Sequence, residues 1–260
     1  MDSSIRKFIF HDLQAIEGYI DPPDALVFLA VLLSQQSASL RGSLAEIGVY
    51  YGRSYFLLRK ICGDTEKIVA IDPFDIVNPD HGATQYERFA AGGRQLGLSV
   101  DAECVIKSDS TLLRPENITE RAGMVRFFSI DGGHMLHHVA ADSRLAAASL
   151  AEHGIIVFDD TFNPAWPEVT AGVTDFLREE AGRFSVFCLT KYKTYVCRQA
   201  FREFYARAIR TSPELKAFDH IETEFLGSTA IRLHNPIRRR IAYEVMVGLG
   251  MRALSERVYR

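Results

Sequence analysis

The middle of the chain alternates between short β-favouring apolar runs and longer helical stretches. The β-favouring runs are SLAEIG, KIVAIDPF, DAECVIKS, MVRFFSID and GIIVFDD, followed by FSVFCLT and TYVCR. This alternation predicts a parallel α/β sheet, and the nearly continuous apolar character of the early runs fits strands that helices cover on both faces. Only KYK separates the last two runs, which restricts them to an antiparallel hairpin. We therefore predict a Rossmann-like α/β sheet of five parallel strands plus a terminal antiparallel hairpin.

Helical periodicity fills the gaps between these strands and extends into both flanks. Residues 135–151 and 168–181 have helical patterns, and a glycine follows each of them closely as a stop signal. Residues 1–40 read as a helical segment, residues 41–198 as the sheet domain, and residues 199–260 as a mostly helical extension. Neither flank is joined by a low-complexity linker, so we expect both to pack on the core. The extension is expected to serve as a lid or an oligomer contact, which makes a homo-oligomer possible.

Composition narrows the class of protein. Of the 260 residues, 47% are hydrophobic and 24% charged, and the formal net charge is -3, so nothing indicates a nucleic-acid partner. The longest apolar run, ALVFLAVLL, is about half of the roughly 20 residues that a membrane span needs. The N-terminus lacks the pattern of a secretory signal, and the four cysteines lack C-x-x-C spacing. We expect a cytoplasmic protein without membrane or redox function.

The stretch EIGVYYGRS joins the first strand to a helix and is a candidate ligand-binding turn. Glu46 closes the strand, Gly48 and Val49 follow, and Gly52 and Ser54 open the helix. Glycine allows a sharp turn against a ligand, and the free N–H groups at a helix start attract a carboxylate. Glu46 could act on an ammonium group, directly or through water. The turn therefore suits an amino-acid moiety.

Two alternatives remain open for this turn. The dinucleotide fingerprint G-x-G-x-x-G would make the protein an NAD-type oxidoreductase, but Gly48 and Gly52 are four apart with bulky residues between them, which leaves less room for a diphosphate. An ordinary strand-to-helix turn is the other alternative.

The next two strand ends favour an adenosine ligand. Asp72 ends KIVAID, 24 residues after Gly48, where a carboxylate can accept both ribose hydroxyls. Phe74 could pack on the adenine. The third strand ends in Ser108, Asp109 and Ser110, and Asp109 could accept from the adenine amino group. Ligands of open α/β sheets bind at this edge, so three consecutive strand ends converge on one adenosine.

Carboxylates follow the fourth and fifth strands. Asp131 ends FFSID, and Asp159 and Asp160 end GIIVFDD. Neighbouring strands lie about 4.8 Å apart, so the three carboxylates should converge and repel one another. A bound divalent cation resolves this repulsion, and oxygen ligands favour Mg²⁺ or Mn²⁺. Alternatively, Asp159 and Asp160 only cap the turn around Asn163-Pro164.

His134 lies about one helical turn beyond Asp131 and is the candidate general base. Histidine has a reference pKa near 6.5 and can accept a hydroxyl proton at neutral pH. In an alternative reading, His134, His138 and Asp131 form a nitrogen-rich site for zinc or iron. H-x-x-H-H, however, lacks the glutamate of the H-E-x-x-H zinc helix.

With both constellations in place, the chain resembles the class I methyltransferases, and among them the bacterial metal-dependent small-molecule O-methyltransferases of the macrolide-sugar type. The similarity covers about residues 40–198. It lies in the turn EIGVYYGRS and in the succession of D-G-x-H, a helix, a glycine-led strand and D-D within IDGGHMLHHVAADSRLAAASLAEHGIIVFDD. His134 stands where catechol-type enzymes have lysine, as in the sugar enzymes. Glu168 departs from the glycine that relatives often have, so the path of the loop over the site is not predicted.

The resemblance implies S-adenosylmethionine as the cofactor and assigns residues to it. Methionine contacts fall at Glu46, Gly48 and Ser54, ribose contact at Asp72, and metal ligation at Asp131, Asp159 and Asp160. The full set of predicted cofactor-binding residues is Glu46, Gly48, Val49, Gly52, Ser54, Asp72, Phe74, Ser108, Asp109, Ser110 and Asp131.

The expected reaction is direct methyl transfer from S-adenosylmethionine to a hydroxyl of a small molecule, with sugar-like or other natural-product acceptors favoured. His81, Tyr86 and Trp166 lie in loops beyond the strand ends and could contact the acceptor, or serve only in surface or lid packing. The alternatives are an NAD-type oxidoreductase and a catalytically silent S-adenosylmethionine-binding protein.

Overall fold

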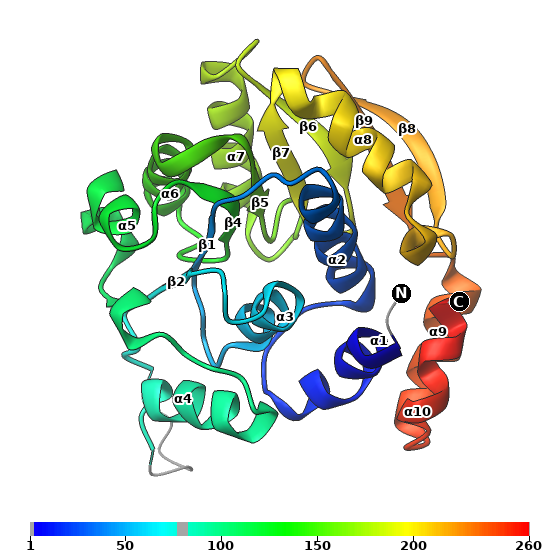
Figure 1. The fold of residues 1–260 in the computed structure, drawn as a ribbon. Helices are drawn as coiled ribbons and strands as arrows, with labels where there is room; N and C mark the ends of the chain where they lie inside the picture. Colours follow the sequence, from blue (N-terminus) through cyan, green and yellow to red (C-terminus); the bar gives the residue numbers. More distant parts are fainter. Residues whose placement is uncertain (1–2, 77–82, 260) are drawn as a thin grey trace.

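A single mixed sheet organises the molecule, which is described from a computed structural model covering residues 3–76 and 83–259 (Figure 1). The strand order within the described residues is β3-β2-β1-β4-β5-β7-β6-β9-β8. Strands β1 to β5 are parallel, β7 is antiparallel to β5 and β6, and β9 is parallel to β6 and antiparallel to β8. The strands are β1 Ser43–Ile47, β2 Ile68–Asp72, β3 Val105–Lys107, β4 Val125–Ile130, β5 Leu150–Phe158, β6 Phe184–Leu189, β7 Thr194–Arg198, β8 Asp219–Phe225 and β9 Ser228–His234.

The five parallel strands and the β6–β7 hairpin lie where the sequence predicted them, but the predicted sheet is incomplete. Nine strands form the described sheet, because β8 and β9 extend it beyond β6. These two strands belong to residues 199–260, for which a mostly helical structure was expected. Strand β8 reads DHIETEF, whose charged residues hide a strand pattern, because an edge strand needs few apolar side chains. The sheet is thus continuous across residue 198.

Helices cover both faces of the sheet and form a hydrophobic core on each face. Neighbouring residues of one strand point to opposite faces and therefore pack into different cores. Phe127 of β4 packs into the core with α1, α2, α3, α4 and α8, and Phe128 into the core with α5, α6 and α7. The bounds are α1 Ser3–Phe10, α2 Pro22–Ser37, α3 Arg53–Cys62, α4 Gln85–Leu96, α5 Pro115–Ala122, α6 Leu136–Ser149, α7 Pro167–Glu179, α8 Arg202–Thr211, α9 Ile237–Gly248 and α10 Arg252–Ser255. Short 3-10 helices span Asp12–Ala15, Ala102–Cys104, Ser110–Leu112, Gln199–Phe201, Pro213–Leu215 and Glu256–Tyr259.

The two flanks meet each other as well as the core. Phe10 of α1 stacks on Tyr259 near the other end of the chain, with ring centroids 5.8 Å apart, and Figure 1 places α1 beside α9 and α10. The run ALVFLAVLL lies in α2, and most of its residues are fully buried. None of the helices in the described ranges has both the length and the apolar character that crossing a bilayer requires. The expected role of the extension as a lid or oligomer contact stays a prediction.

Candidate active site

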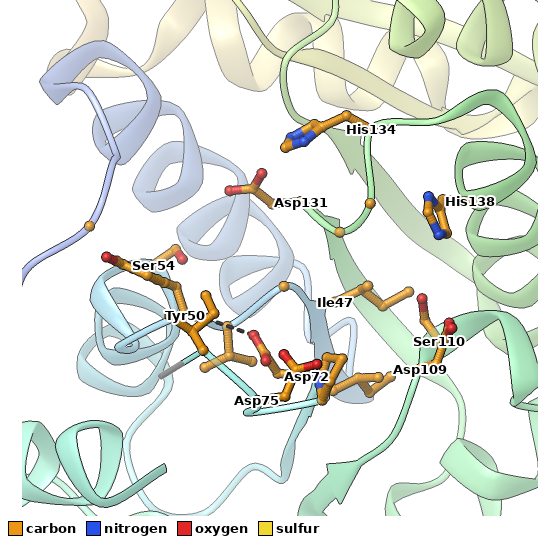
Figure 2. A pocket seen from close by; sticks show the side chains of 18 of the residues that line it. Ile47, Tyr50, Ser54, Asp72, Asp75, Asp109, Ser110, Asp131, His134 and His138 are labelled. Carbon is orange, nitrogen blue, oxygen red and sulfur yellow. Dashed lines mark hydrogen bonds between the residues drawn. The ribbon is translucent and has the colours of Figure 1, made fainter. Parts of the chain in front are cut away.

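A cavity of about 510 Å³ opens at the carboxyl ends of β1 to β4 (Figure 2). The structure brings most of the predicted cofactor residues to it, namely Gly48, Val49, Ser54, Asp72, Ser108, Asp109, Ser110 and Asp131. His134 and His138 also line it. Figure 2 places Asp131 and His134 at one end of the cavity and Asp109 and Ser110 at another, with Asp72 next to Asp75. The sequence argument about strand ends therefore located one continuous cavity.

Gly48 is required by the approach of a neighbouring strand. Its φ is 80°, and a Cβ atom there would lie 1.7 Å from the carbonyl oxygen of Asp131. The first strand's turn thus packs directly against the end of β4, which is a different reason for glycine from the one expected. Gly52 has a φ of 92°, and its Cβ would meet the rings of Phe56 and Phe89 within 3 Å. Gly52 does not line the cavity.

Asp72 fixes the turn that precedes it in the chain. Its Oδ2 accepts from the backbone N–H of Tyr50 at 2.9 Å (Figure 2). Its Oδ1 accepts from Phe74 N at 2.7 Å and from Gln85 Nε2 at 3.0 Å. Tyr50 and Phe74 both have positive φ, 52° and 53°. Such strain persists only where the surroundings hold it, and it gathers at functional sites. Asp72 therefore orders both loops that border the cavity.

Glu46 lies behind the cavity wall and does not line the cavity. Its side chain is fully buried, and neither carboxylate oxygen has a hydrogen-bond partner of good geometry among the described residues. Burial raises its pKa to about 8, although the nearby Ser54 hydroxyl acts in the opposite direction. Below this pH the carboxyl group is mostly neutral and can be buried without a counter-charge, whereas the ionised form needs a cation nearby. Its predicted contact with an ammonium group stays a prediction.

Two aromatic residues predicted at the site pack instead on each other. Phe74 is buried, with its ring 5.4 Å from Tyr86 and 5.6 Å from Phe89, and neither Phe74 nor Tyr86 lines the cavity. The ammonium group of Lys107 lies 3.3 Å from the centroid of the Tyr86 ring. These two side chains support the loop after β2. His81, also proposed for the acceptor, lies outside the described residues.

Near β3, Asp109 lines the cavity, and Asp142 is a buried carboxylate outside the cavity lining. Asp109 accepts from the N–H and hydroxyl of Thr111 at 2.9 and 2.8 Å, and these bonds lower its pKa. Asp142, on α6, is fully buried beside Ser110, and burial raises its pKa to about 6. The sequence analysis missed Asp142 because a lone aspartate in a helix pattern gives no sign of which face it occupies.

His134, Asp131 and Asp160 form a compact group at the opposite end. Their ligating atoms lie within 4.8 Å of one another, and His134 Nε2 lies 3.1 Å from Asp160 Oδ2. The imidazole lowers the pKa of Asp160, whereas burial, followed by the charge of Asp159, raises that of Asp131 well above its usual range. The Trp166 ring stacks on His134, with centroids 4.2 Å apart at 12°. The imidazole is therefore held in one orientation.

The loop after β5 also contains part of the turn that was considered as an alternative. Asp160 Oδ1 accepts from Asn163 Nδ2 at 2.6 Å, and Asp159 Oδ1 accepts from the N–H of Asp160 at 2.7 Å. Asp160 and Phe162 have positive φ values of 54° and 68°. The two aspartates thus shape the turn, but Asp160 still presents its second oxygen to His134.

Lys193 is the main site residue that the sequence analysis missed. It is 5% exposed and forms an ion pair with Asp159 Oδ2. Burial opposes its charge, but Asp159 and then Asp24 outweigh burial and raise its pKa. Asp24 also accepts hydrogen bonds from Thr190 at 2.6 Å and from Tyr195 at 2.8 Å. Asp159, one of the three predicted metal ligands, therefore already has a cationic partner.

Comparison with known proteins identifies the class. Residues 45–161 match the model of a family described as a methyltransferase domain, and this segment contains the glycine turn, the adenosine-site strand ends and the aspartate–histidine group. The matched segment, a little under half of the chain, is similar to a methyltransferase domain. This match supports the expected S-adenosylmethionine-dependent methyltransferase and favours it over the oxidoreductase alternative. No curated protein sequence matches the chain closely enough to count as a relative.

Several solved structures are similar to this chain. The O-methyltransferase NovP has a TM-score of 0.53 and 13% sequence identity, over 66% of this chain and 77% of that one. The calicheamicin methyltransferase CalS11 has a TM-score of 0.48 and 20% identity, covering 68% and 78%. The Bacillus cereus O-methyltransferase in complex with SAH has a TM-score of 0.49 and 14% identity, covering 75% and 90%. The similarity to NovP establishes the fold.

The N-terminal flank completes the cavity of the methyltransferase domain, which sequence reasoning did not anticipate. Gly18 and Tyr19 line the cavity. Arg53 Nε donates to the carbonyl of Ile16 at 2.7 Å, and the Tyr50 hydroxyl donates to Glu17 at 2.9 Å. Residues 12–20 are thus held against the glycine turn. The sequence offered no signal for this contact, because loop docking depends on tertiary structure.

Proposed function

We propose that the protein transfers a methyl group from S-adenosylmethionine to a hydroxyl of a small, sugar-like or other natural-product molecule. The carbon–sulfur bond of the sulfonium breaks as the new carbon–oxygen bond forms, which yields S-adenosylhomocysteine, a methyl ether and one proton. The observation that carries the proposal is the His134–Asp160 pair beside Asp131, at the end of a cavity lined by adenosine-type strand ends. NovP, which has the same fold, is an O-methyltransferase.

The cofactor side of the proposal rests on the arrangement around the cavity. Asp72 would accept from the ribose hydroxyls, and Asp109 with Ser108 and Ser110 would surround the adenine. Ser54 and the start of α3 would face the methionine carboxylate, because helix N–H groups attract anions. This arrangement would leave the Asp131 end of the cavity, where His134 lies, for the methyl group and the acceptor hydroxyl.

His134 would act as the general base. Asp160 and the stacked Trp166 ring orient the imidazole, and an adjacent carboxylate stabilises the imidazolium that forms when the hydroxyl proton arrives. The protein otherwise contributes by holding the two reactants in line and excluding water, which converts a bimolecular encounter into a local one. The base therefore requires the neutral imidazole and an ionised Asp160.

Asp131 and Asp160 also suit a divalent cation. Mg²⁺ is commonly held by one or two carboxylates and keeps several waters, so these two carboxylates suffice without Asp159, which Lys193 occupies. The ligating atoms of Asp131, His134 and Asp160 lie within 4.8 Å of one another, which is close enough for one cation to contact both carboxylates. Mg²⁺ or Mn²⁺ at this site would supply Lewis-acid chemistry to the acceptor oxygen.

The test combines cofactor binding with turnover. Calorimetry should detect S-adenosylhomocysteine binding and not NAD binding, and His134→Gln should keep that affinity while lowering turnover with radiolabelled donor by about 100-fold or more. The neighbouring His137→Gln, whose residue does not line the cavity, is the matched control. Preferential NAD binding, or wild-type turnover in His134→Gln, would overturn the proposal. A wild-type protein that is inactive with every acceptor would favour a catalytically silent binding protein. Full activity after exhaustive chelation would refute the proposed metal requirement.

A further inference from the structure

A second cavity lies at the same edge of the sheet, on the far side of β5. It encloses about 820 Å³ and is bordered by the start of α2, the turn between β6 and β7, the end of β9, and α9. Strands β5, β6 and β9 all end at this edge, because β9 is parallel to β6, and both β5 and β6 are antiparallel to β7. The two cavities are therefore arranged side by side along one sheet edge.

The loop that follows β5 borders both cavities. Trp166 near its end stacks on His134 in the first cavity, whereas Phe162 lines the second and has its ring 5.4 Å from that of Phe225. Between them, Lys193 pairs with Asp159 on one side and faces Asp24, which lines the second cavity. The reacting end of one cavity and the interior of the other are thus built on shared elements.

Three carboxylates and three cations line the second cavity, namely Asp21, Asp24, Glu244, Lys191, Arg232 and Arg240, and they differ in whether they already have partners. Asp24 is already bonded to Thr190 and Tyr195, and Glu244 lies 3.7 Å from Arg240. Lys191 and Arg232 line the cavity as exposed cations, and in the described part of the chain neither has a carboxylate within ion-pair distance. Asp21 remains as a carboxylate, but it sits at the N-terminus of α2, whose dipole is positive there. Lys191 and Arg232 are therefore the cations, exposed and unpaired within the described ranges, that an anionic ligand can reach in this cavity.

The sheet sets the distance between the reaction and these cations. From β4, which ends in Asp131, the order β4-β5-β7-β6-β9 gives three strand spacings to Lys191 and four to Arg232, or about 14 to 19 Å. A ligand that reaches both places must be elongated. Tyr243, which is half-buried, also lines this cavity and presents part of an aromatic ring to an apolar sugar face.

We propose that the second cavity receives the distal part of the methyl acceptor, and that the acceptor is an elongated polyhydroxylated molecule with a phosphate or carboxylate about 14 to 19 Å from the methylated hydroxyl. Lys191 and Arg232 bind the anion. This inference rests on the proposed O-methyl transfer and adds the shape and charge of the acceptor. It also explains why the methyltransferase sheet continues into β8 and β9, because β9 supplies Arg232.

The experiment measures binding by calorimetry with three matched probes, maltotriose, maltotriosyl phosphate and maltotrionate, on the protein saturated with S-adenosylhomocysteine. We expect both anionic probes to bind at least tenfold more tightly than neutral maltotriose, and the tighter of the two names the anion. Arg232→Glu combined with Lys191→Glu should abolish this preference. Arg207→Glu, on the exposed face of α8, reverses one charge away from the cavity and should retain the preference.

Equal binding of the three probes by the wild type, or an anion preference that survives the double substitution, would overturn the inference. The titrations are repeated without S-adenosylhomocysteine, and its own binding is measured in each variant. Loss of cofactor binding in the wild type would defeat the proposed function, whereas normal cofactor binding without an anion preference would defeat only the acceptor assignment. The two failures therefore give different results.

Discussion

The contact between Gly48 and the end of β4 can be tested by adding one methyl group. In Gly48→Ala, the left-handed φ of 80° costs roughly 1–2 kcal/mol, and the overpacked Cβ, 1.7 Å from the Asp131 carbonyl oxygen, adds about 1–3 kcal/mol. We therefore expect the free energy of unfolding to fall by about 2–5 kcal/mol in urea titrations. Because the carbonyl that must move belongs to Asp131, turnover should also fall in the fraction that remains folded.

Gly97→Ala is the matched control for this prediction. Gly97 caps α4 with a φ of 63°, and nothing lies within 4 Å of the position of its Cβ. This variant carries the backbone strain without the collision, so it should lose only about 1–2 kcal/mol. The difference between the two variants measures the contact with β4. If both lose the same stability, within about 0.5 kcal/mol, the turn is not held against Asp131 as described.

Three further predictions follow from the buried charges and the stacked base. Lys193→Met should lower the free energy of unfolding in urea by about 3–5 kcal/mol, because it leaves the Asp159 carboxylate buried without its cation. Adding Asp159→Asn should recover most of this loss, and additive losses in the double variant would contradict the pairing. The pKa of Glu46 is about 8 when folded and near 4.5 when unfolded, so the folded state holds the extra proton between these values and stability falls as pH rises through that window. Glu46→Gln should reduce this dependence of the free energy of unfolding on pH. Urea titrations at several pH values that give the same dependence for the variant and the wild type would refute the prediction. Trp166→Ala should lower kcat/KM about threefold to tenfold by releasing the His134 ring, with cofactor affinity unchanged; an unaltered kcat/KM would show that the stack does not position the base.

Sequence reasoning located what a parallel strand carries at its end. Asp72, Asp109 and Asp131 follow β2, β3 and β4 directly, so knowing the strands was enough to place them at one edge. Lys193 was not predicted as a site residue because β7 runs antiparallel to β5. The residue that reaches this edge therefore precedes the strand instead of following it. The pairing of Lys193 with Asp159 changes the expected metal ligands, and no pattern within the chain encodes that long-range contact.

The C-terminal part of the sheet has a consequence for handling the protein. Strand β6 reads FSVFCL and is buried throughout, whereas β8 at the outer boundary exposes Asp219, Glu222 and Glu224. A chain cut at residue 198 would present β6 as a free apolar edge, which is a template for intermolecular strand pairing. The charged β8–β9 hairpin thus covers β6 and prevents its pairing with strands of other molecules. Trimming the protein further, to the segment 45–161 that matches the methyltransferase family, would also remove β6 and β7 and leave β5 as the free edge.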